Sequence, residues 1–126
     1  MDITREQLLT PVEVSKEKVE IPELGGHIWI KGMTAAGRSR FERQFQSATG
    51  KSSVRKISEI RERLVIACAC DENGKSLFTE EDIKSLGKQS IGIIERIVNA
   101  AQRICIMTDE DVEALAKNSE EVDEIS

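Results

Sequence analysis

The side chains that could do chemistry are few in this chain of 126 residues, and they lie far apart in the sequence. The single histidine, His27, has no nucleophile, base or orienting group near it, and triad chemistry needs three positioned groups. Cys68 and Cys70 stand at the end of a predicted helix, where their side chains point about 200° apart and cannot easily share a tetrahedral metal ion. We therefore predict no catalytic residue, no metal ligand and no cofactor, and hence no enzyme.

The segment DENGKSLFTEED, residues 71–82, is partly similar to a calcium-binding loop. Asp71 and Asn73 occupy liganding places, but the glycine is fourth instead of sixth, and the twelfth residue is Asp82 rather than glutamate. Lys75 fills another liganding place, so a bound cation would meet a lysine. The segment predicts a turn and a capped helix. The Gly25–Gly26 pair likewise lacks the spacing and the lysine of a phosphate-binding loop.

The charge of the chain is unevenly distributed. The net charge of −5 argues against nucleic acid as the main partner, because phosphate binding needs a cationic surface. Residues 31–63 nevertheless hold nine Lys or Arg against three acids, and residues 109–126 hold eight acids against Lys117. This pattern fits a solvated surface with a loose tail, or alternatively head-to-tail attraction between copies or capture of an oppositely charged partner.

Cysteine usage and hydropathy indicate the setting in which the protein works. The odd count of three cysteines and the lack of an apolar signal segment favour a reduced, cytosolic environment. The longest apolar run, residues 64–70, is far too short to cross a bilayer, so we expect no membrane insertion.

A β-hairpin is predicted over about residues 17–32. Apolar residues alternate along its two strands, at Val19, Ile21, Ile28 and Ile30. Pro22 limits the first strand, and Gly25 and Gly26 are expected to supply the positive φ values of a tight turn. Trp29 points to the face opposite Ile28 and Ile30. Because an isolated hairpin is only marginally stable, it must lean on the helices or on another chain.

The rest of the sequence predicts helices. We expect them at residues 5–9, 35–48, 54–70, 83–86 and 91–106 and from 109 onward, with a flexible loop at 47–53. Start signals pair Thr4 with Gln7, Thr79 with Asp82, and Thr108 with Asp111. The fold class is mainly α with an N-terminal β-hairpin: one small helical domain over residues 1–118, followed by a disordered acidic tail over 119–126.

Three segments together resemble the tail assembly chaperones of long-tailed bacteriophages: VEIPELGGHIWIKGMT at 19–34, the stretch from CDENGKSLFTEEDI to AAQRI at 70–104, and VEALAKNSEE at 112–121. The resemblance covers most of residues 17–120. It implies a non-enzymatic chaperone that works in the host cytoplasm and is absent from the mature virion. It also implies that the chain binds and solubilises the tape measure protein, recruits the major tail protein, and self-associates.

Many members of that family exist in two forms, the longer one made by a −1 ribosomal frameshift. A slippery heptamer A AAA AAC is translated as a codon ending in A, then Lys, then Asn. Ala116, Lys117 and Asn118 fit this pattern, which makes them the predicted frameshift position.

A chaperone of this kind needs apolar surface and a charged, soluble remainder. The predicted contact residues are Trp29 and Ile30 on the hairpin, and Arg38 and Arg43 on the helix at 35–48. An alternative is that Trp29 packs on a helix of its own chain. The alternative functions are a small structural head or tail component retained in the virion, and an RNA-binding or regulatory module.

Overall fold

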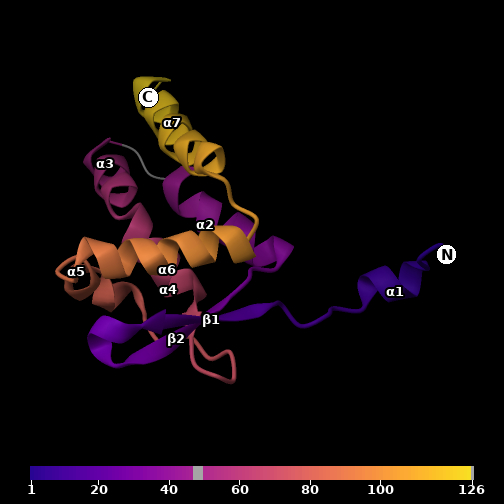
Figure 1. Ribbon diagram of the computed structural model, residues 1–126. Coiled ribbons are helices and arrows are strands. Elements are labelled where there is room, and N and C mark those ends of the chain that lie inside the picture. Colours follow the sequence, from indigo (N-terminus) through magenta and orange to yellow (C-terminus); the bar gives the residue numbers. More distant parts are fainter. Residues whose placement is uncertain (47–49, 126) are drawn as a thin grey trace.

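In the computed structural model, most of the helices pack on one side of a small antiparallel sheet (Figure 1). The structure describes residues 1–46 and 50–125, without the side chains of residues 52, 53 and 118–125. The helices are α1 (Arg5–Leu9), α2 (Ala35–Gln46), α3 (Gly50–Ser58), α4 (Ile60–Cys68), α5 (Ile83–Leu86), α6 (Ile91–Ile104) and α7 (Asp109–Ile125); the strands are β1 (Lys16–Ile21), β2 (Gly26–Lys31) and β3 (Ala69–Cys70). The predicted fold class, mainly helical with an N-terminal hairpin, is confirmed.

The hairpin has the predicted register of apolar residues but a different turn. Val19 pairs with Ile28 across β1 and β2, which places the apolar side chains on one face. A 3₁₀ turn, η1 (Pro22–Leu24), joins the strands, and only Gly25 has a positive φ, of 75°. The expected two-glycine tight turn is therefore wrong: Pro22 starts a wider turn, and Gly26 already belongs to β2.

The inner face of the sheet packs under α6 and α4. Ile30 of β2, Phe45 of α2 and Val65 of α4 are among the fully buried side chains of one continuous apolar cluster. Phe41 and Phe45 meet edge to face, with their ring centroids 5.3 Å apart. Helix α6 contributes six buried residues, Ile93, Ile94, Ile97, Val98, Ala100 and Ala101. Because aromatic residues are few, this aliphatic stripe forms much of the core.

The region predicted as one helix over 54–70 contains three elements. Helix α3 ends at Ser58, whose hydroxyl donates to the carbonyl of Arg55 at 2.6 Å, and α4 begins at Ile60. The last two residues, Ala69 and Cys70, form β3, with Ala69 opposite Ile30. Of the loop predicted over 47–53, residues 47–49 lie outside the described residues, and Gly50 already begins α3, so the loop prediction is wrong from residue 50 onward.

At the other end of the chain, α7 packs against α2 and α3. Its backbone is helical through Ile125, where the sequence favoured an acidic tail without structure from residue 119. The side chains beyond Lys117 lie outside the described residues, so the domain boundary at residue 118 stays a prediction.

Candidate protein-interaction surface

The outer face of the sheet carries the single tryptophan. Trp29 is half-buried, and the Nζ atoms of Lys16 and Lys18 lie 5.8 Å and 5.9 Å from the centroid of its ring. His27 contacts the indole edge to face, at 6.2 Å between centroids. The indole is thus flanked by two lysines and a histidine of its own sheet, and the lysine stems cover part of the apolar ring while their charges stay in water.

Ile30 lies on the opposite face, with no exposed surface. It is a core residue opposite Ala69, so it has no surface to offer a partner in this conformation. Of the two hairpin residues predicted to bind a partner, only Trp29 is therefore accessible.

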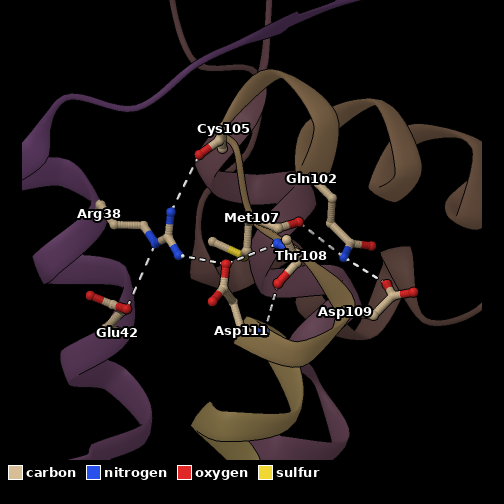
Figure 2. A network of polar contacts seen from close by, with 8 residues as sticks. All are labelled: Arg38, Glu42, Gln102, Cys105, Met107, Thr108, Asp109 and Asp111. Atoms are coloured by element: carbon tan, nitrogen blue, oxygen red, sulfur yellow. Dashed lines mark hydrogen bonds and ion pairs between the residues drawn. The ribbon is translucent and has the colours of Figure 1, made fainter.

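Arg38 bridges α2 to the connection between α6 and α7 (Figure 2). Its guanidinium donates to the carbonyl of Cys105 at 3.3 Å and lies 3.4 Å from Oδ2 of Asp111 and 3.7 Å from Glu42. Asp111 also caps the start of α7, because its carboxylate accepts the backbone N–H of Thr108 at 2.9 Å. This N–H and the nearby Arg38 lower the pKa of the Asp111 carboxyl.

These contacts join the basic and acidic parts of the chain within one molecule. Arg38 belongs to the cationic stretch and Asp111 to the anionic end, and α7 packs on α2 and α3. Part of the charge asymmetry therefore serves the chain's own packing. Arg43, on the same helix, is exposed, and of the two predicted arginines it is the more accessible.

Ile106 has a backbone conformation that β-branched residues rarely adopt. It follows the C-cap of α6 with φ 54°, and the N–H of Met107 donates to the carbonyl of Gln102 at 2.8 Å. The N–H of Ile106 itself donates to Arg103, which completes a Schellman motif. The left-handed position, usually a glycine, is thus occupied by a large apolar residue that is 82% exposed. Nothing in the sequence signalled this, because no glycine marks the end of α6.

The candidate calcium loop is a turn, as predicted. Oδ1 of Asp71 accepts the backbone N–H groups of Asn73 at 2.9 Å and Lys75 at 3.0 Å, which lowers the pKa of its carboxyl. At the following helix start, the N–H of Thr79 donates to Asp82 at 2.8 Å. In the described ranges no group of three or more His, Cys, Asp or Glu side chains could hold a metal ion.

The cysteines lie where the sheet meets α4 and α6. Cys68 and Cys70 are buried, and Sγ of Cys68 is 3.6 Å from Sγ of Cys105. Hydrogen bonding to Cys105 and burial raise the pKa of the Cys68 thiol, so it stays protonated at neutral pH. Cys68 and Cys70 thus behave as small core residues.

Two hollows complete the surface. A cavity of about 480 Å³ with a mixed polar and apolar lining lies beside the start of α2, and its charged or polar lining residues include Lys31, Arg40, Gln44, Arg63 and Glu80. The second, about 320 Å³, lies at the hairpin turn and is mostly apolar. We call it the turn-end groove; its lining includes Ile21, Leu24, Ile28, Phe78, Leu86 and Ile93. The groove has no signal in the sequence because its walls come from five separate segments.

None of the described helices is long and apolar enough to span a membrane. No family model matches the sequence, and no curated protein matches it.

A comparison with solved structures gives a match to the tail assembly chaperone of bacteriophage HK97. The match has a TM-score of 0.53 at 13% sequence identity, and it covers 72% of this chain and 85% of that chain. The resemblance noted in the sequence is thus confirmed in three dimensions: this chain has the fold of a bacteriophage tail assembly chaperone.

Proposed function

We propose that this protein is a phage tail assembly chaperone that binds and solubilises the tape measure protein and recruits the major tail protein. The observation that carries the proposal is the fold shared with the HK97 tail assembly chaperone over most of both chains. In this proposal the protein acts in the host cytoplasm, without catalysis, and is absent from the mature virion.

The surface supports a role in protein binding. Ten large apolar side chains are exposed among the described residues, including Leu8, Leu9 and Leu24, and the remaining surface is rich in charge. Apolar patches on a charged, soluble body suit a protein that covers aggregation-prone segments of another chain. Trp29 and Arg43 are the predicted contact residues that remain accessible.

The test is co-expression with the tape measure protein of the same phage. We expect the soluble fraction of the tape measure protein to rise severalfold, and the two chains to co-purify. A Trp29→Ala variant should weaken this effect, whereas Val54→Ala, which removes an exposed apolar side chain from α3, should not. A tape measure protein that is equally insoluble with and without the chaperone would contradict the proposal.

Mass spectrometry of purified virions separates the proposal from the alternative of a structural head or tail component. We expect the chain to be missing from the particle, and its presence at stoichiometric amounts would favour the alternative. Recruitment of the major tail protein is tested by adding it to the purified pair.

The frameshift hypothesis is tested on the gene. We expect a repeated-base heptamer over the codons of Ala116, Lys117 and Asn118, and a longer product in infected cells. Because Asn118 lies within α7, the frameshift would replace the last helical residues with another sequence. A gene without such a heptamer would overturn this placement.

A further inference from the structure

Eight of the ten large apolar side chains that are exposed among the described residues gather at two opposite ends of the molecule. One end carries the N-terminal arm, defined as residues 1–13, together with Ile106 at the end of α6. The exposed apolar residues of the arm are Met1, Ile3, Leu8, Leu9 and Val12. The other end carries the turn-end groove, with Leu24 and Leu77 exposed at its walls.

The N-terminal arm does not pack against the described residues of the body. All of its residues are exposed, and α1 has no buried side chain. Within the described residues its hydrogen bonds stay inside the arm: Thr4 and Gln7 cap one another, and Thr10 bonds to Glu6. A helix of five residues is not stable in water without packing, so α1 needs another surface to persist.

The turn-end groove offers such a surface. Its walls come from the hairpin turn, α4, the segment before η2 (Glu80–Asp82), α5 and α6, and they are mainly aliphatic and aromatic. Its volume of about 320 Å³ lies at the lower end of the range for small-ligand pockets, about 300–1,000 Å³, which suits a pair of side chains better than a folded element.

The two features lie at opposite ends of the same sheet. The arm leaves at the start of β1, and the groove begins at Ile21, the last residue of that strand. Six strand residues span about 20 Å. Helix α6 runs antiparallel to β1, with Arg103 beside Glu17 and Arg96 beside Glu23, and spans about 21 Å. The carbonyls of Ser15 and Ile104 both lie close to Gly32, which places the base of the arm beside the far end of α6. Figure 1 shows the arm extending away from the body, so it does not reach its own groove.

Resting on the proposed function and on the self-association that the family resemblance implies, we propose that the arm of one copy docks in the turn-end groove of a second copy. Leu8 and Leu9 of α1 are the side chains that enter the groove. Charge favours the same partner: the arm holds Asp2, Glu6 and Glu13 against Arg5. Beside the groove, α5 carries Lys84, and Lys88 follows it; both are exposed. Because the two patches differ and lie at opposite ends, the contact is head-to-tail and leaves a free arm and a free groove on each pair.

The experiment measures association of the purified full chain by sedimentation velocity over a wide range of concentration, without any client. We expect the wild type to form species larger than a dimer. The double variant Leu8→Asp with Leu9→Asp, and separately Leu24→Asp, should weaken association by about tenfold or more. Val54→Asp, at an exposed apolar site on α3 outside both patches, should associate like the wild type.

Mixing the two defective variants gives the decisive result. The arm variant keeps an intact groove, and the Leu24→Asp variant keeps an intact arm, so an equimolar mixture should form a heterodimer and nothing larger. Unchanged melting temperatures would show that both variants are folded. A monomeric wild type, wild-type association by either variant, or a mixture that stays monomeric would overturn the inference.

The client assay distinguishes this inference from the proposed function. If Leu24→Asp abolishes solubilisation of the tape measure protein but leaves self-association intact, the groove holds the client and the arm docking is wrong. If neither variant self-associates but both still solubilise the client, both proposals stand.

Discussion

At the level of single residues, Ile106 stores backbone strain in the connection that orients α7. An L-residue in the left-handed region costs about 1 kcal/mol or more relative to glycine, and β-branching adds to this cost. Since its side chain is 82% exposed, removing it loses little burial. We predict that Ile106→Gly raises the free energy of unfolding by about 0.5–1 kcal/mol, measured by urea denaturation.

Ile106→Ala is the matched control for that prediction. It removes the same apolar surface but keeps a Cβ atom at φ 54°, so it should stabilise the protein much less than glycine. Equal effects of the two substitutions would show that side-chain exposure, rather than backbone strain, governs stability there.

The side chain of Arg63 should contribute strongly to the stability of the fold. It is 6% exposed, and its guanidinium donates to Gln44 at 2.8 Å and to Glu59 and Glu80 at 3.0 Å. It thereby joins α2, α4 and η2. Truncation removes three hydrogen bonds and the packing of a buried side chain, and it leaves the partly buried Glu59 without its counter-charge. We therefore predict that Arg63→Ala lowers the free energy of unfolding by about 3 kcal/mol.

The paired measurement is Glu80→Gln. The side chain of Glu80 is 75% exposed, so solvent screens its charge, and the change should cost about 1 kcal/mol or less. A loss as large as that of Arg63→Ala would mean that the Glu80 contact, and not burial of the guanidinium, carries the stabilisation.

At the level of elements, the hairpin turn is fixed to α6 by one bidentate ion pair. The guanidinium of Arg96 donates to both carboxylate oxygens of Glu23, at 2.8 Å and 2.7 Å. This bond lowers the pKa of Glu23 from 4.5 to about 2. A depressed folded pKa means that the stabilisation is fully present above pH 4.5 and is lost as the pH falls from there toward 2.

We predict that NMR titration of the Glu23 carboxyl gives a midpoint near pH 2 in the wild type and a clearly higher midpoint in Arg96→Met, which stays below 4.5 because the backbone N–H of Glu23 still donates to the carboxylate. Asp111 is an internal reference, because its lowered pKa depends first on the N–H of Thr108 and should survive the Arg96 substitution. A Glu23 midpoint that does not move in Arg96→Met would show that the turn and α6 are not joined by this pair.

Elements with local signals were predictable from the sequence, and elements fixed by distant contacts were not. The helix starts at Thr4, Thr79 and Thr108 follow from side chains three residues away, and the hairpin follows from period-two alternation. Strand β3 does not, because Ala69 and Cys70 continue a helical stripe and become a strand only by pairing with β2. The break at residue 59 similarly lacks a glycine or proline.

The same distinction holds for the candidate surface. The outward face of Trp29 was predictable from strand parity, whereas Ile30 shares the buried parity and belongs to the core. The role of Arg38 depends on Cys105 and Asp111, which lie far along the chain, so its type alone suggested a partner contact. The turn-end groove has no sequence signal because its walls meet only in the fold.

At the level of the whole molecule, charge and apolar surface have separate roles. The sequence pattern of a basic middle and an acidic end suggested attraction between copies, but Arg38 and Asp111 meet within one chain, at a junction where α7 packs on α2. Seven of the ten large exposed apolar residues among those described, by contrast, lie on the arm or at the walls of the turn-end groove, at opposite ends. Contacts between copies should therefore depend mainly on burial of apolar surface.

Salt separates these two driving forces. At 1 M ionic strength the Debye length falls to about 3 Å, which removes most attraction between exposed charges, whereas burial of apolar side chains persists. We predict that sedimentation velocity of the wild type still finds association at 1 M NaCl, weakened only by the screened attraction between the acidic arm and the lysines beside the groove, Lys84 and Lys88. Leu24→Asp should stay dissociated in both. Association that disappears at high salt would instead identify the opposite charges of residues 31–63 and 109–126 as the link between copies, with the arm left as an unpaired extension.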